Sequence, residues 1–211
     1  MKKIYFILVL LLGLSTYAFA QCNNSDDYAA LYALYNSTDG ISCKSGAALT
    51  NSGSITISNI QGSNSEAITN EATFTNENTG TIVINTVGSS FGILNSSVSA
   101  SFINNGSITT SNTFLNGLRN TSETVFGGSG SISMNIFENL ANLSPGNSPG
   151  AITLNGNLVS SGSYDVEIDS KVGIGIGHDY LQVNGDINLD VGINITNNTP
   201  GGTKQVYITE N

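Results

Sequence analysis

The sequence predicts an all-β protein, a parallel β-helix (β-solenoid) in which each coil takes about 25 residues. A repeated glycine is the first reason, because four similar segments carry one at intervals of 27, 26 and 24 residues: Gly53, Gly80, Gly106 and Gly130. Short β-rich runs with apolar residues at alternate positions follow each glycine, as half-buried strands require. Turn-forming Asn, Gly and Ser residues separate the runs. A fixed period of about 20 to 50 residues is typical of a solenoid, whose core forms only when repeats stack.

Each coil is predicted to contain three strands and three corners. The strands after the glycines are expected at 55–57, 82–84, 108–110 and 132–134, and a second set is expected at 67–70, 92–95 and 113–116. The Ile, Phe and Val residues of these runs are expected to form the core, and no cofactor is needed to explain them. Three asparagines follow an apolar pair in the second set, where they either stack as an amide ladder or act as ordinary turn formers: Asn70, Asn95 and Asn116.

Residues 1–20 are predicted to be a secretory signal peptide. Lys2 and Lys3 precede an apolar run, and Ala18-Phe19-Ala20 forms a small-x-small cleavage site before Gln21. The run is too short for a permanent transmembrane helix, so no integral membrane segment is expected after cleavage. The mature protein is thus predicted to be secreted or exposed at a bacterial cell surface. A lipoprotein anchored through Cys22 is the alternative, although Gln21 is not the small residue that this anchor needs.

The charge balance argues against two classes of partner. The chain has 15 acidic and 6 basic residues, a net charge of −9, and cleavage after Ala20 removes two lysines and leaves −11. Nucleic acids and anionic membranes need clustered cations, so neither is expected to bind. Charged residues make up 10% of the chain, against about 25% in an average globular protein. The abundance of uncharged Asn, Ser and Thr suits the outer face of a β-solenoid.

Residues 21–48 are predicted to form an N-terminal cap. A helix is expected at residues 26–35, where apolar residues recur at three-four spacing behind capping aspartates. This segment resembles the capping segment that precedes repeat domains of bacterial surface proteins, including leucine-rich repeat proteins. Cys22 and Cys43 are the only cysteines of an exported chain, and no cluster of histidines suggests metal binding, so a disulfide is predicted between them. A loop of this length would stabilise the fold by about 3 kcal/mol.

A family resemblance covers the stretch from Leu143 to Ile195. It rests on the phrase Leu-Ser-Pro-Gly-Asn-Ser-Pro-Gly-Ala-Ile-Thr-Leu from Leu143, on Tyr-x-Val-Glu-Ile from Tyr164, and on His-Asp-Tyr-Leu-Gln-Val-Asn-Gly-Asp-Ile from His178. This order of motifs resembles the distal passenger segment of autotransporter-type and related bacterial surface β-helix proteins, which are adhesin-like proteins of the outer membrane. The resemblance implies a right-handed parallel β-helix, with solenoid repeats at 49–140 and passenger-like coils at 141–211. Because no barrel or sorting domain follows Ile195, it also implies either a truncated reading frame or a different anchor.

Few residues have the character of catalytic or metal-binding groups. Arg119 is the only arginine, and its neighbours indicate a surface turn. Asp165, Glu167 and Asp169 alternate in one strand and share a face, which is either a solvated acidic surface or a weak calcium site. The pair His178 and Asp179 suggests half of a catalytic triad, but no serine is marked as its nucleophile, so a turn is favoured. No catalytic, cofactor-binding or metal site is predicted.

The sequence therefore favours a secreted or cell-surface structural or adhesive protein without catalytic activity. Its repetitive Asn, Ser and Thr face is expected to meet glycans or extracellular proteins through many modest hydrogen bonds. One alternative is a polysaccharide lyase or hydrolase, which would need a basic residue or paired carboxylates in a cleft. Another is an ice-binding surface, which would need regular rows of Thr. Thr56, Thr81 and Thr109 are out of step for such a row, and Ser133 follows them.

Overall fold

The described part of the chain consists of β-strands and the turns that join them. A computed structural model describes residues 20–21, 41–58, 66–85, 91–110, 116–121, 123–146, 149–170, 173–190 and 192–197. These residues contain no helix, and all 17 pairings between strands are parallel. The predicted all-β parallel solenoid is therefore confirmed. The helix expected at residues 26–35 lies outside the described residues.

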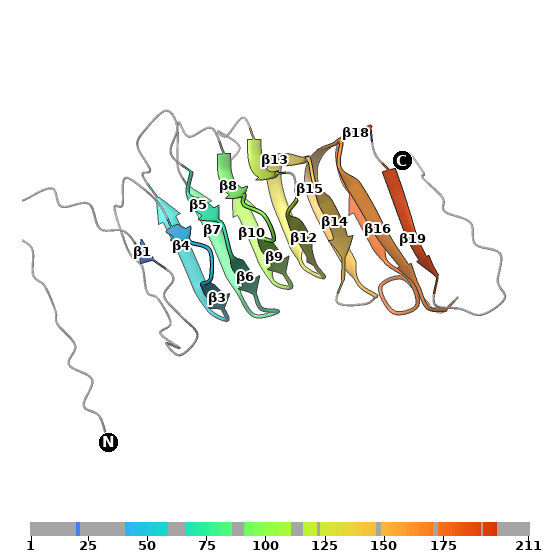
Figure 1. The fold of residues 1–211 in the computed structure, drawn as a ribbon, viewed down its shortest axis with the longest axis horizontal. Coiled ribbons are helices and arrows are strands. Elements are labelled where there is room, and N and C mark those ends of the chain that lie inside the picture. The colour runs from blue at the N-terminus through green and yellow to red at the C-terminus, as the bar shows by residue number, and fades with distance from the viewer. Residues whose placement is uncertain are drawn as a thin grey trace, which may run out of the picture.

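Strands from successive coils stack into three walls that run along the solenoid. In every coil the chain passes through wall 1, wall 2 and wall 3 in that order (Figure 1). Wall 2 is a sheet of seven strands: β3 (Ala48–Asn51), β6 (Thr73–Asn76), β9 (Ser101–Asn104), β12 (Val125–Gly128), β14 (Asn142–Pro145), β16 (Ser163–Ile168) and β19 (Gly192–Asn197). Strands on both sides of residue 141 belong to this sheet, so the solenoid runs on without interruption past the Pro-Gly motifs.

Walls 1 and 3 belong to one sheet of twelve strands. Wall 1 contains β2 (Ile41–Cys43), β5 (Ile68–Asn70), β8 (Phe91–Asn95), β11 (Asn116–Asn120), the second halves of β13 (Ser131–Asn139) and β15 (Ala151–Ser160), and β18 (Ile187–Leu189). Wall 3 contains β4 (Ser54–Ser58), β7 (Thr81–Asn85), β10 (Ser107–Thr110), the first halves of β13 and β15, and β17 (Tyr180–Val183).

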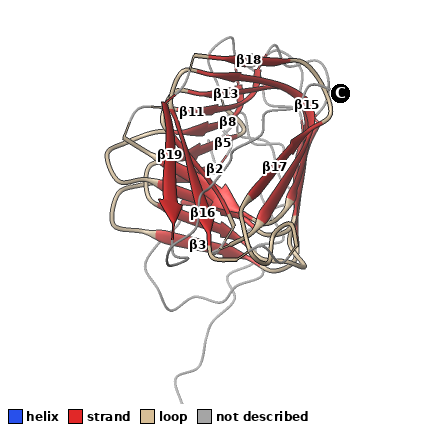
Figure 2. Cartoon of the chain, turned by 90° about the vertical axis from the view of Figure 1, so that its right-hand side faces the viewer, coloured by secondary structure: helices blue, strands red, loops and turns tan. Residues whose placement is uncertain are grey.

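The long strands β13 and β15 join walls 3 and 1 without a loop. Their mutual pairing shifts register between Ser133 and Ile136, which marks a β-bulge, and a bulge bends a strand. In earlier coils, the wall 3 strand and the next wall 1 strand are separate strands joined by an intervening segment. Seen along the solenoid axis, the walls enclose a single interior (Figure 2). The twelfth strand of this sheet, β1 (Ala20–Gln21), pairs with β2, and the predicted cleavage site lies between its two residues.

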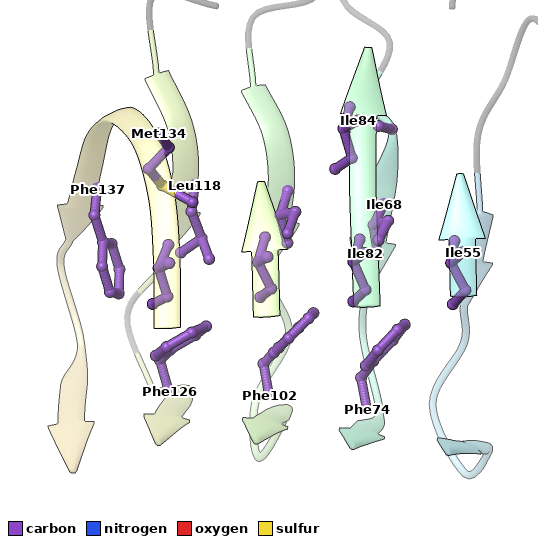
Figure 3. Packing of buried hydrophobic residues seen from close by; sticks show 14 of the residues in the cluster. Ile55, Ile68, Phe74, Ile82, Ile84, Phe102, Leu118, Phe126, Met134 and Phe137 are labelled. Carbon is purple, nitrogen blue, oxygen red and sulfur yellow. The ribbon is translucent and has the colours of Figure 1, made fainter. Parts of the chain in front are cut away.

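The core is built from columns of like residues, because the coils stack in register. In wall 2, Phe74 and Phe102 stack with ring centroids 4.5 Å apart, Phe102 stacks on Phe126 at 5.5 Å, and Phe126 meets Phe137 of wall 1 edge-to-face (Figure 3). All four rings are almost fully buried. Each such pair adds about 0.5–1.5 kcal/mol to the burial of the rings. Wall 1 carries a column of four aliphatic residues that ends on a phenylalanine: Ile41, Ile68, Ile93, Leu118 and Phe137. Wall 3 carries a wholly aliphatic column: Ile55, Ile82, Ile108, Ile132 and Leu154.

Two asparagine ladders run through the interior beside these columns. The wall 1 ladder joins the amides of Asn70, Asn95, Asn120 and Asn139, each Nδ2 donating to the next Oδ1 at 2.7–2.8 Å, and it ends on the Ser160 hydroxyl. A second ladder, in wall 2, joins Asn51, Asn76 and Asn104. Every member is the last residue of its strand and is buried. The ladders therefore satisfy the polar groups of two corners inside the apolar core.

One predicted member of the ladder was wrong. Asn116 pairs with Phe91 at the start of β11, and Asn120 takes the position beside Asn95. Asn116 follows Phe114 and Asn120 follows Leu118 at the same two-residue spacing, so the local pattern fits both. The interval of 25 residues that separates Asn70 from Asn95 recurs from Asn95 to Asn120 and distinguishes them.

Only one of the two cysteines of the predicted disulfide lies among the described residues. Cys43 ends β2, is fully buried and lies in register with Asn70, so it occupies the position before the first amide of the wall 1 ladder. Cys22 lies outside the described residues. The pairing of Cys22 with Cys43 therefore stays a prediction.

Candidate functional site

A shallow groove follows the corner between walls 2 and 3 across successive coils. Its volume is about 400 Å³. Turn residues form one side: Asn78, Thr79, Asn105 and Ser129. Outward-facing residues of wall 3 form the other: Thr81, Ser107, Ser131 and Thr153. Three glycines lie between the two sides: Gly80, Gly106 and Gly130. The groove is thus built by the same repeated glycine segment that predicts the fold.

The glycines form the floor because no side chain fits where the coils stack. The Gly80 carbonyl accepts a hydrogen bond from the Ser107 N–H at 2.9 Å, and the Gly106 carbonyl accepts one from the Ser131 N–H at the same distance. A Cβ atom added to Gly106 would lie 2.1 Å from the Gly80 oxygen, and one added to Gly130 would lie 2.3 Å from the Gly106 oxygen. Gly53, in the first described coil, has open space around it.

A straight row of hydroxyl groups forms the wall 3 side of the groove. Strand register places these residues directly beside one another, one per coil: Ser54, Thr81, Ser107, Ser131 and Thr153. The four that line the groove are half-buried. Within the described part of the chain, their hydroxyls form no side-chain hydrogen bond.

The turn residues on the opposite side are held by hydrogen bonds to the neighbouring coil. The Thr79 hydroxyl donates to the Ser52 carbonyl at 2.9 Å, and the Ser129 N–H donates to Asn105 Oδ1 at 3.1 Å. These bonds fix the turns relative to one another along the axis. The groove therefore has a defined shape before any ligand binds.

The chemistry of the groove is limited to neutral hydrogen bonding. None of its lining residues is ionisable and none is aromatic. Hydroxyl and amide groups both donate and accept hydrogen bonds, but they cannot act as the acid and base of a hydrolase. Among the described residues, no group of three or more His, Cys, Asp or Glu side chains is placed to hold a metal ion. The arrangement can bind a polar, uncharged surface.

Arg119 lies away from the groove, and its expected position in a turn was wrong. It is part of β11 in wall 1, directly beside Glu138, and its Nε lies 2.8 Å from Glu138 Oε2. Its guanidinium also lies 4.8 Å from the centre of the Phe91 ring. The two contacts join the side chain to β13 and β8, the strands on either side of β11, which is a structural role.

The acidic strand and the His-Asp pair also lie apart from the groove. Asp165 Oδ2 accepts a hydrogen bond from Asn142 Nδ2 at 2.6 Å. Asp179 is 6% exposed, and its two oxygens accept the N–H groups of Gly150 and Glu167, both at 2.8 Å. Burial raises the pKa of Asp179, an effect that its two backbone hydrogen bonds oppose and the charge of Glu167 reinforces. Asp179 therefore joins two segments of backbone.

Sequence reasoning identified the floor of the groove but missed its sides. The signal was present beside each glycine, because uncharged polar residues flank it in every repeat: Ser52 and Ser54, Thr79 and Thr81, Asn105 and Ser107, Ser129 and Ser131. The two flanking residues lie on opposite sides of a groove only if the glycine is at a corner, which the sequence predicts, and the groove is continuous only if the corners stack, which requires the register.

Two further findings bear on the setting of the chain. Within the described ranges, no helix has the length and apolar character needed to cross a membrane. No family model, curated protein or solved structure matches this chain.

Proposed function

We propose that this chain is an exported bacterial surface protein with a structural or adhesive role and no catalytic activity. In this proposal residues 1–20 direct export, and the mature protein from Gln21 is a right-handed solenoid displayed outside the cell. The right-handed sense agrees with the strong preference of parallel crossover connections. The resemblance of residues 143–195 to autotransporter-type passengers supports the same setting.

The continuous uncharged groove is the observation that carries the adhesive role. Four coils contribute to it: three offer a turn residue, a glycine and a wall 3 hydroxyl, and the fourth offers the Thr153 hydroxyl. A single neutral hydrogen bond contributes about 0.5–1.5 kcal/mol, so useful affinity requires several bonds formed together. Successive coils of the solenoid supply several such bonds, and simultaneous binding by several protein molecules strengthens attachment further.

The internal ladders and aromatic stack support the adhesive role by making the groove rigid. Amide hydrogen bonds of 2.7–2.8 Å join adjacent coils in two corners, and the phenylalanine stack joins them in wall 2. A surface that is ordered before binding loses less conformational entropy when a partner docks. The binding groups are therefore held at a constant spacing.

Export and binding can be tested on one preparation. The full chain would be expressed in a Gram-negative host, recovered from the exported fraction and analysed by mass spectrometry, where a mature N-terminus at Gln21 is expected. The purified protein would then be screened against neutral and acidic glycans and against matrix proteins, with and without calcium. Saturable binding is expected. Retention of residues 1–20 would refute export by this segment, and release of reducing sugar from a polysaccharide would refute the non-catalytic role.

A further inference from the structure

We infer that the groove binds an extended, uncharged polysaccharide chain that lies parallel to the solenoid axis. This inference rests on the proposed adhesive function and names its ligand class. The residues that carry it are the two rows on either side of the glycine floor. The hydroxyl row is formed by Thr81, Ser107, Ser131 and Thr153, and the turn row by Asn78, Thr79, Asn105 and Ser129.

The direction of the ligand follows from the way the groups repeat. Register places one hydroxyl of the row in each coil, and adjacent parallel strands are about 4.8 Å apart. Thr81 and Thr153 are therefore separated by three coil spacings. A sugar residue in an extended polysaccharide has a length comparable to one spacing, so successive sugars meet equivalent groups. A chain lying across the axis would meet only one coil.

The kind of ligand follows from the chemistry of the two rows. Hydroxyl and amide groups match the hydroxyl groups of a sugar as both donors and acceptors. The lining carries no cation to bind a polyanion, and after cleavage the net charge of −11 would repel one. The absence of aromatic rings from the lining means that sugar faces have nothing to stack on. Affinity must then come from hydrogen bonds added coil by coil.

The experiment compares ligand length and charge with variants on the two outward rows of wall 3. Linear neutral gluco-oligosaccharides, from disaccharide to hexasaccharide, would be titrated against the full chain by calorimetry, with oligogalacturonates as the acidic comparison. Thr81→Val and Thr153→Val remove a groove hydroxyl and keep the β-branched shape that suits a strand. Thr109→Val is the matched control, because Thr109 faces outward from β10 in the adjacent row, outside the groove.

We expect affinity to rise from disaccharide to tetrasaccharide and to level off beyond it. Each groove variant is expected to weaken binding of the tetrasaccharide by about threefold to tenfold, the range for one hydrogen bond, and Thr109→Val to leave it unchanged. Circular dichroism and thermal unfolding would check that the variants fold. Equal weakening by Thr109→Val, an affinity independent of length, or tighter binding of the acidic ligand would overturn the inference.

The outcomes separate this inference from the broader proposal. Binding of the unmodified protein to another glycan or to a matrix protein, unaffected by Thr81→Val, would overturn the groove as the site and leave the adhesive function standing. Failure to bind any glycan or protein in the screen would overturn both.

Discussion

Asn95 donates a hydrogen bond from its Nδ2 to Oδ1 of Asn120, 25 residues further along the chain, at a distance of 2.8 Å. The same Nδ2 donates to the Val125 carbonyl at 3.0 Å, and Asn95 Oδ1 accepts from Asn70. One buried side chain thus connects three consecutive coils at a corner. A buried polar network that is fully satisfied favours a single packing arrangement, since any slip in register would leave amides unpaired.

Loss of an internal ladder amide should destabilise the solenoid strongly. In Asn95→Ala, Asn70 Nδ2 loses an acceptor, and Asn120 Oδ1 and the Val125 carbonyl lose a donor. Unsatisfied buried polar groups cost about 1–3 kcal/mol each, so we expect the free energy of unfolding to fall by about 2–4 kcal/mol. Urea denaturation followed by circular dichroism measures this change.

The control for this prediction is an exposed amide pair. Asn184 donates to Asn155 at 2.8 Å on the outer surface, and Asn184→Ala should change stability by no more than about 0.5 kcal/mol. If the two substitutions had similar effects, the buried ladder would contribute no more than a surface hydrogen bond.

The repeated glycines should tolerate a methyl group only where no described atom lies in its path. Gly106→Ala would place Cβ 2.1 Å from the Gly80 carbonyl oxygen, and we expect a loss of about 3 kcal/mol or more because backbone would have to move. In Gly53→Ala the added Cβ has no atom within 4 Å. We expect stability to change little or to rise slightly, because alanine reduces the conformational freedom of the unfolded chain. Thermal unfolding of both variants tests this contrast, and equal melting temperatures would contradict it.

A buried threonine in wall 3 offers a route to higher stability. Thr110 occupies the position that Ile57 and Ile84 hold in the two preceding coils, and it is 3% exposed. Among the described residues, its hydroxyl has no hydrogen-bond partner. Thr110→Val keeps the β-branched shape of the side chain and removes the unpaired hydroxyl, so the free energy of unfolding should rise by about 1 kcal/mol. A lower denaturation midpoint for Thr110→Val would show that the hydroxyl is paired in solution.

Asp179 should make stability increase as pH falls. Burial raises its pKa in the folded state above the ordinary value of 3.8, so the folded protein takes up a proton before the unfolded chain does. This contribution is fully present below pH 3.8 and is lost as pH rises through the folded-state pKa. The difference in unfolding free energy between the unmodified protein and Asp179→Asn should therefore grow in favour of the unmodified protein as pH is lowered from 7. A difference independent of pH would contradict the shift.

The fold could be predicted because its determinants are local and repeated. Alternation of apolar residues identifies strands, and the recurring glycine identifies a corner, so the parallel β-solenoid follows from periodicity. Asn70 and Asn95 were recognised for the same reason. The wall 2 ladder was missed, although Asn51, Asn76 and Asn104 stand two residues after Leu49, Phe74 and Phe102 in the repeated segment.

Features that depend on how neighbouring coils align could not be predicted from the periodicity of the sequence. Arg119 was expected in a turn and lies in β11, whose pairing with β8 extends to Asn120. The choice between Asn116 and Asn120 also depends on which residues of neighbouring coils pair. Burial of Asp179 arises from contacts with Gly150 and Glu167, which are 29 and 12 residues away and carry no shared motif.

The sequence by itself determined the solenoid, the glycine corners and the uncharged polar character of the outer face, because each depends on residue type and spacing along one coil. Only the tertiary structure decided that outward hydroxyls form a straight row, that turn residues face them across a glycine floor, and that the amides of two corners join into ladders. These features depend on the register of one coil upon the next. Register is set jointly by many stacked side chains, so no single repeat contains it.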